Sequence, residues 1–186
     1  MIEIRDLTVR FDQKVVLDGF SADVPLSGTT AVEGPSGAGK TTLLRVLCGL
    51  TKPDGGRVSG LSGLRVGMLF QEDRLLPWRT ALENVCEVTD AAQAAVLLTD
   101  LGLGDAMHLR PAALSGGMQR RTAIARLLAL PSDILLLDEP FTGLDEAAKR
   151  VAAAAILRQN APVLVVTHDE SEAALLQTAR RIRIAR

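Results

Sequence analysis

A glycine-rich segment near the start of the chain has the composition of a phosphate-binding loop. Residues 34–41 read Gly-Pro-Ser-Gly-Ala-Gly-Lys-Thr, which fits the pattern G-x-x-x-x-G-K-S/T. Glycines let backbone N–H groups approach phosphate oxygens, and the helix predicted from Lys40 to Leu50 presents its N-terminus to an anion. Lys40 supplies a charge for the β- and γ-phosphates, and the Thr41 hydroxyl can bind Mg²⁺. The pattern predicts nucleotide binding and leaves kinases, GTPases and ATPases open. The predicted contacts are Gly34, Pro35, Ser36, Gly37, Ala38, Gly39, Lys40, Thr41 and Thr42.

Two carboxylates, Asp138 and Glu139, directly follow the continuous apolar run 134–137. Such a run is typical of a strand buried on both faces. Ligands of open α/β sheets bind at the carboxyl ends of the strands. Asp138 is therefore placed to hold Mg²⁺, and Glu139 to polarise an attacking water as a general base.

A second anion-binding helix end is predicted at Ser115-Gly116-Gly117. Ser115 caps a helix that extends to about Leu130, and the two glycines expose its first N–H groups. A flexible turn is the alternative interpretation of these three residues. This helix end is separate in the sequence from the one at Lys40.

Residues 114–121, Leu-Ser-Gly-Gly-Met-Gln-Arg-Arg, resemble the signature of ATP-binding cassette (ABC) proteins. The resemblance extends over nearly the whole chain. Gln71 resembles the Q-loop glutamine of that family, residues 142–145 its D-loop, and His168 its H-loop histidine. Phe11 stands where the family has an aromatic residue that stacks on adenine.

The resemblance implies an ATPase that uses ATP and Mg²⁺. It assigns catalytic roles to Lys40, Gln71, Glu139 and His168, and metal contacts to Thr41, Gln71 and Asp138. It also implies that two copies, or paired cassettes, pack head-to-tail. Each ATP then lies between the phosphate loop of one chain and Ser115, Gly116 and Gly117 of the other, so that hydrolysis releases the closed state.

Strands alternating with helices predict an α/β fold. Strands are expected at 2–11, 15–24, 29–33, 64–70, 134–137, 163–166 and 182–185, and helices at 40–50, 80–88, 91–101, 115–130, 146–160 and 171–178, with a turn at 51–56. The resemblance implies a P-loop NTPase core with a mostly parallel sheet, an N-terminal antiparallel β subdomain and a small inserted α-helical lobe. We expect a single domain, 1–186, with its core in 1–70 and 115–186 and its lobe in 71–114.

Composition excludes other classes of protein. The 186 residues carry a net charge of −1, which provides no basic surface for nucleic acid. The longest apolar run, 151–157, is far shorter than the ~20 residues that span a bilayer. Charges near the N-terminus do not fit a signal peptide, so we expect a cytoplasmic protein. Cys48 and Cys86 are expected to be small core residues.

The family mostly drives transport, so the resemblance implies a separate integral membrane permease that places this chain peripherally on the cytoplasmic side of a bacterial membrane. Residues 71–79 are expected to line the docking groove, with Trp78 either in the interface or packed in the lobe. The segments 75–79 and 82–85 resemble those of nitrate, sulfonate and taurine importers. An importer also implies a periplasmic or extracellular solute-binding protein.

The sequence leaves three alternatives open: the ATPase subunit of an exporter, a soluble cassette ATPase without a permease, and an inactive nucleotide-binding module. The soluble class typically has two cassettes or a long coiled-coil insertion, and this sequence has neither. The inactive module is disfavoured because Lys40, Asp138, Glu139 and His168 are all present.

Overall fold

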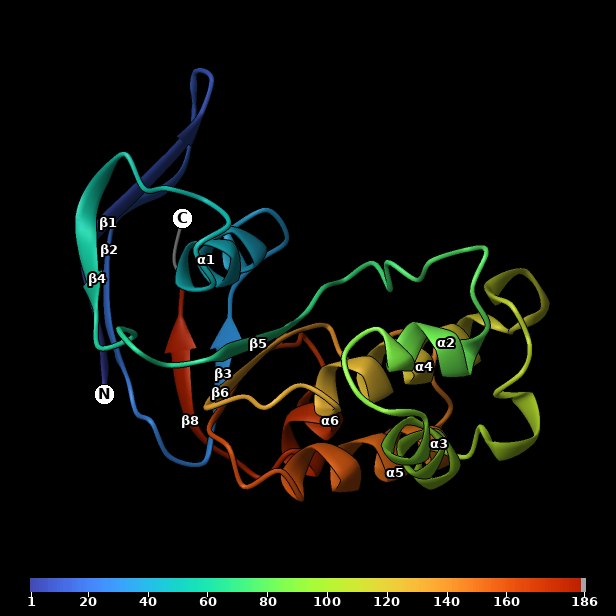
Figure 1. Ribbon diagram of the computed structural model, residues 1–186. Coiled ribbons are helices and arrows are strands. Elements are labelled where there is room, and N and C mark those ends of the chain that lie inside the picture. The colour runs from blue at the N-terminus through green and yellow to red at the C-terminus, as the bar shows by residue number, and fades with distance from the viewer. Residues whose placement is uncertain (185–186) are drawn as a thin grey trace.

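Two β-sheets and six α-helices make up residues 1–184, the part of the chain that the computed structural model describes (Figure 1). The antiparallel sheet has the order β2-β1-β4, built from β1 (Ile2–Phe11), β2 (Lys14–Val24) and β4 (Gly55–Ser59). The parallel sheet has the order β5-β6-β7-β3-β8. The predicted α/β class is therefore confirmed.

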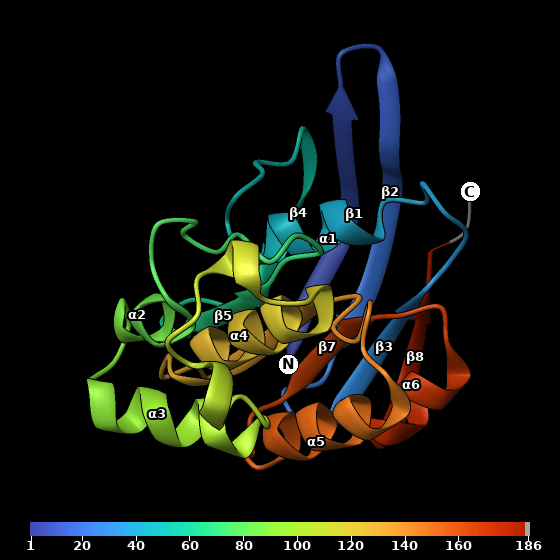
Figure 2. The ribbon, with the colours of Figure 1, turned by 90° about the vertical axis from the view of Figure 1, so that its right-hand side faces the viewer.

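The parallel strands are short and the helices cover both faces of their sheet (Figure 2). The strands are β3 (Thr29–Glu33), β5 (Val66–Leu69), β6 (Ile134–Asp138), β7 (Val163–Val166) and β8 (Thr178–Arg183). The helices are α1 (Lys40–Leu47), α2 (Ala81–Cys86), α3 (Ala91–Asp100), α4 (Gly116–Leu128), α5 (Glu146–Leu157) and α6 (Glu170–Leu175), with 3-10 turns at Gly104–Ala106 and Pro111–Ala113.

The continuous apolar run of β6 serves two cores at once. Successive strand side chains point to opposite faces, so Leu135 and Leu137 join the core formed with α2 to α5, while Ile134 and Leu136 join the core beneath α1 and the antiparallel sheet. All four side chains are buried. The prediction of a strand buried on both faces is confirmed. Because the strand is packed on both faces, the position of Asp138 at its carboxyl end is fixed.

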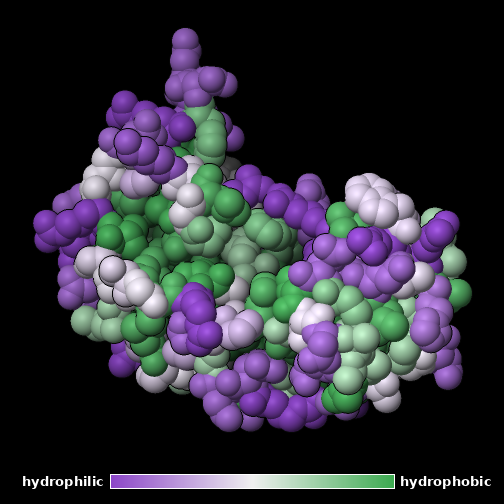
Figure 3. All heavy atoms as spheres, in the orientation of Figure 1, coloured by the Kyte–Doolittle hydropathy of each residue, from purple (hydrophilic) through white to green (hydrophobic). Residues whose placement is uncertain are grey.

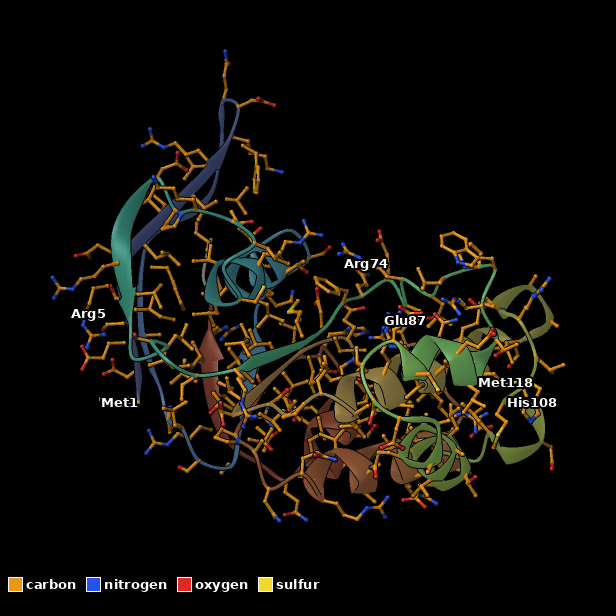
Figure 4. All side chains as sticks on the ribbon, viewed as in Figure 1. Met1, Arg5, Arg74, Glu87, His108 and Met118 are labelled. Atoms are coloured by element: carbon orange, nitrogen blue, oxygen red, sulfur yellow. The ribbon has the colours of Figure 1, made fainter. Side chains whose placement is uncertain are left out.

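The segment between β5 and α4 contains α2, α3 and both 3-10 turns, and it lies beside the parallel sheet (Figure 1). The predicted capping box begins α2: the Thr80 hydroxyl accepts a hydrogen bond from the Glu83 amide, and the Glu83 carboxylate accepts one from the Thr80 amide. His108 lies at the outer end of this region, far from Arg5 on the antiparallel sheet (Figure 4). Helix α4 packs against α2 and α3 of the predicted lobe and also against α5 and β5 of the predicted core. These contacts do not separate the lobe from the core, so the domain boundaries at 71 and 114 stay a prediction.

Most predicted elements are confirmed with ends shifted by a few residues. The helix predicted to reach Leu50 ends at Leu47, because Gly49 adopts a left-handed conformation with φ of 76°. The prediction for the last elements was wrong. The helix stops at Leu175, Gln177 takes φ of 53°, and Thr178 already begins the strand that pairs with β3. The predicted end of that strand, Ala185, lies outside the described residues.

Strand β4 was not predicted, because a turn was expected at 51–56 and no regular element between it and the strand at 64–70. Only Val58 in this strand packs against a core cluster, so no alternating pattern marks it. Pairing with β1 creates the strand, and Val58 lies opposite Ile4. Cys48 and Cys86 are partly buried at the margins of the two cores rather than inside them, and both thiols are free.

Apolar side chains also gather on the surface, in a hollow between β4 and β5 and over α1 (Figure 3). Val58 of β4 and Val66 and Met68 of β5 are partly buried and pack against the second core. Within residues 1–184, none of the helices has the length and apolar character needed to cross a membrane.

Candidate nucleotide-binding site

A cleft of about 630 Å³ opens where β3, β6 and β7 end. It collects residues from distant parts of the sequence: Phe11, Lys14, Val16, Gly34, Ser36, Gly37, Gly39, Lys40, Thr41, Thr42, Gln71, Asp138, Glu139, Val166 and His168. Strand β2, which has eleven residues, supplies one wall of the cleft. Phe11, at the end of β1, lines the margin of the cleft, and 47% of its surface is exposed. An exposed aromatic ring at the edge of a polar cleft is available to stack on a planar ligand.

The phosphate loop has a backbone that only glycine tolerates at two positions. Gly34 and Gly39 have φ of 153° and 97°. A Cβ on Gly39 would lie 2.8 Å from Leu17 Cδ2, and one on Gly34 would lie 2.6 Å from the Ile184 carbonyl oxygen. Lys40 folds back over this loop, where its ammonium group donates to the carbonyls of Gly34 and Pro35 at 2.7 and 2.9 Å. The lysine charge is thus held above the open N-terminus of α1.

Asp138 is buried at the floor of the cleft, with 2% of its surface exposed. Burial raises the pKa of its carboxyl group above the usual value, even though the Thr41 hydroxyl donates a hydrogen bond to it and Arg120 lies nearby. Its Oδ2 atom has no hydrogen-bond partner among the described residues. A buried acceptor without a partner, next to a hydroxyl, fits a hard cation with oxygen ligands such as Mg²⁺.

Glu139 reaches the cleft from a strained backbone, with φ of 46°. Its Oε1 atom lies 3.6 Å from His168 Nδ1, on a histidine whose side chain is 78% exposed. The carboxylate and the imidazole therefore face the same open space. This arrangement suits a general base and a polar partner around a water molecule.

Some predicted residues lie outside the cleft. Ala38 is buried in the core, and Pro35 lines a neighbouring cavity with Arg181. Ser115, Gly116 and Gly117 do not line the cleft. They begin α4, where the Ser115 hydroxyl accepts the Met118 amide at 3.2 Å, so the predicted N-cap is confirmed.

Residues 17–142 match the family model for the ABC transporter. The chain belongs to the ABC transporter family. As a member of that family it binds and hydrolyses ATP, and the resemblance inferred from its motifs is confirmed.

Curated relatives of this ABC protein include the aliphatic sulfonates import ATP-binding proteins SsuB 2 of Streptomyces avermitilis and SsuB 3 of Paraburkholderia xenovorans. They are 40% and 41% identical to it over 94% and 100% of its length, and it covers 73% and 76% of theirs. Two solved dimeric structures of the cassette MJ0796, one of them in a post-hydrolysis state with ADP and Pi, share 27% identity with TM-scores of 0.89 and 0.87. Each comparison covers 99% of this chain and 94% of that one. The predicted P-loop fold is thereby confirmed.

Several residues around the site of this ABC protein were not predicted. Lys14 and Val16 line the cleft because β2 runs past the phosphate loop, and no motif marks them. Behind His168, the Thr167 hydroxyl donates to the buried Glu172 carboxylate at 2.7 Å, and Lys149 pairs with that carboxylate at 3.3 Å. The sequence predicts no separate role for Arg120, which it includes only in the signature. Its position on a buried helix face, among apolar neighbours at helical spacing, is the signal that would have identified it.

The clash at Gly39 predicts a binding defect. Gly39→Ala is expected to weaken ATP binding by about tenfold or more, equivalent to ~1.4 kcal/mol, because the added methyl group must displace Leu17 or the loop. Titration with a fluorescent ATP analogue measures the effect. Gly63→Ala is the matched control, since Gly63 also has positive φ but a Cβ there meets nothing within 4 Å. Equal affinities in the two variants would contradict the steric argument.

Proposed function

We propose that this chain is the ATP-hydrolysing subunit of a membrane importer for a small solute, and that it works as a head-to-tail dimer or paired cassette. The observation that carries the proposal is the separation of two anion-binding elements. The phosphate loop lines the cleft, whereas Ser115, Gly116 and Gly117 do not. A second chain packed in the opposite direction supplies these residues to the open cleft. The dimeric structures of the similar cassette MJ0796 support this arrangement.

In the proposed site, Phe11 stacks on adenine, and the loop residues that line the cleft, among them Ser36, Gly37 and Gly39, wrap the phosphates. Lys40 leaves its loop carbonyls for the β- and γ-phosphates, whose negative charge attracts the ammonium group more strongly. Thr41, Gln71 and Asp138 are the residues that would hold Mg²⁺, which neutralises phosphate charge when bound.

Glu139 is the proposed general base. It accepts a proton from the attacking water at its carboxylate, and His168, 3.6 Å away, aligns the γ-phosphate against it. Gln71 contacts the same water from the loop after β5. Ser115, Gly116 and Gly117 of the second chain direct backbone N–H groups at the γ-phosphate and complete the site. Asp145, which caps α5 by accepting the Ala148 amide at 2.8 Å, keeps a structural role beside the dimer seam.

The proposed permease docks where the loop after β5 meets α4. A small cavity of about 200 Å³ lies there, lined by Phe70, Asp73 and Arg126 among others, and the Arg74 guanidinium stacks 3.9 Å above the Phe70 ring. Trp78, 65% exposed nearby in sequence, offers an aromatic anchor. This places the chain peripherally on the cytoplasmic side of a bacterial membrane, with no role for nucleic acid.

We further propose an organic sulfonate as the solute, delivered by a periplasmic or extracellular solute-binding protein. The support is that the curated relatives, which are about 40% identical to this chain, are aliphatic sulfonates import ATP-binding proteins. In the proposed complex the permease and the binding protein contact the solute, and this subunit does not. The similarity of this subunit to the sulfonate relatives therefore points to the solute through the transporter to which it belongs.

Mutation of the proposed base is expected to trap the ATP-bound dimer. Glu139→Gln is expected to bind ATP but to slow hydrolysis by a factor of about 10²–10⁴, because the amide cannot accept the proton. The variant accumulates as an ATP-bound dimer, which light scattering after size exclusion detects. Glu72→Gln, an exposed carboxylate of the same length outside the cleft, is the control. Unchanged turnover in Glu139→Gln would remove this residue from the base role.

Mixing two inactive chains tests the head-to-tail site. Lys40→Ala destroys the phosphate loop and Ser115→Arg blocks the helix end, so each variant alone is expected to be inactive. In an equal mixture, roughly half of the dimers contain one chain of each variant, and each of these mixed dimers has one intact site of two. The mixture is therefore expected to recover roughly a quarter of wild-type turnover. Recovery is measured as ATP turnover against mixing ratio. If the mixture stays inactive while both variants still dimerise, each chain encloses its own nucleotide.

Reconstitution tests import and cargo. With its permease in proteoliposomes, the chain is expected to hydrolyse ATP several-fold faster when binding protein and an aliphatic sulfonate are present on the side opposite the chain. The carboxylate of equal chain length serves as the matched control solute. Stimulation by solute only on the side of the chain would indicate export, and stimulation by the carboxylate alone would overturn the proposed cargo.

A further inference from the structure

Arg120, in the second turn of α4, is a charged side chain with only 2% of its surface exposed. The five N–H groups of its guanidinium lie within hydrogen-bond distance of six acceptor oxygens. Nε donates to the Pro140 carbonyl at 2.9 Å, and Nη2 to the carbonyls of Asp138 and Glu139 at 2.8 Å each. On the other side, Nη1 donates to the carbonyls of Phe70 and Gln71 at 2.6 and 3.2 Å and to Asp73 Oδ1 at 3.0 Å. A buried guanidinium with this many partners is fully satisfied.

Apart from Asp138, the last residue of β6, these partners belong to two loops that both enter the nucleotide cleft. The loop after β5 carries Gln71, and the loop after β6 carries Glu139. The two strands are hydrogen-bonded neighbours only up to Leu69 and Leu137. Beyond these residues the two segments are no longer paired as strands. The hydrogen bonds of Arg120 connect the loops that follow.

The backbone of Glu139 needs such a link, because φ of 46° is costly for a residue with a side chain. Its amide donates to the Val166 carbonyl at 2.9 Å, which fixes one side of the peptide. Its carbonyl accepts from Arg120 and also from the Thr142 hydroxyl at 3.2 Å. Arg120 further holds the carbonyls directly before and after it. The direction of the Glu139 side chain is therefore determined largely from α4.

We propose that Arg120 is a positioning residue for hydrolysis: it holds Glu139 in its strained conformation and sets it in register with Gln71. The proposal rests on the role of Glu139 as base. Only arginine suits the task, since its planar fork presents five N–H donors in fixed directions. The ammonium group of a lysine would keep the charge but donates from a single atom, which cannot reach both loops.

The test is ATP turnover by Arg120→Lys in the full chain, with Arg120→Gln as a second variant should the lysine fail to fold. We expect kcat to fall about 10- to 100-fold, while KM for ATP and formation of the ATP-bound dimer change less than about threefold. Arg65→Lys is the matched control, because Arg65 makes a bidentate pair with Asp133, at 3.0 and 2.9 Å, outside the cleft.

A double-mutant cycle separates positioning from general support of the fold. In the Glu139→Gln background, Arg120→Lys is expected to lower the single-turnover rate by less than about threefold, because it acts through the group already removed. Full additivity of the two losses, a kcat equal to wild type, or a rise in KM with kcat unchanged would overturn the proposal. A wild-type chain without ATP turnover would overturn the role of Glu139 and this proposal together.

Discussion

The parallel pairing of β3, β7 and β6 is the constraint on which the site depends. Val166 at the end of β7 lies opposite Val32 on one side and Asp138 on the other. The phosphate loop follows β3, the acidic pair follows β6 and His168 follows β7. Because parallel strands all end at the same edge of the sheet, this register brings three segments far apart in the sequence to one cleft. A shift by one residue would turn the acidic side chain toward the other face.

The same edge also concentrates features that are unfavourable for the fold alone. Asp138 keeps a carboxylate in a buried position that raises its pKa, and Glu139 occupies a left-handed conformation. Gly34 and Gly39 are tied to backbone conformations in which no side chain fits. Buried carboxylates and left-handed backbone conformations cost free energy and are typical of functional sites. There, the surrounding structure holds residues in conformations that they would not adopt by themselves. Here the surrounding structure is the apolar strand β6 and the guanidinium of Arg120.

Helix α4 connects the parts of the molecule that the reaction must coordinate. Its N-terminus carries Ser115, the element proposed to reach a second chain. One turn later, Arg120 holds both loops of the cleft, and Arg126 holds the carbonyls of Asp73 and Arg74 in the proposed docking region at 2.8 and 2.9 Å. All three residues belong to one hydrogen-bonded helix, so their relative positions are set by its geometry. One helix thus connects the loops of the nucleotide cleft with the surfaces proposed to meet a second chain and the permease.

The sequence by itself determined the class of fold and the family, and it predicted most of the residues that line the cleft. The phosphate loop, the acidic pair and the Ser115 cap are local patterns whose residue types have few other uses, and continuous apolar runs identify β6 and β7. Strand β4 and the true start of β8 at Thr178 depended on pairing with β1 and β3, which no local pattern encodes. The burial of Arg120 and the distance between Glu139 and His168 likewise came from the tertiary structure, because contacts between residues so far apart in the chain exist only once the sheet has formed.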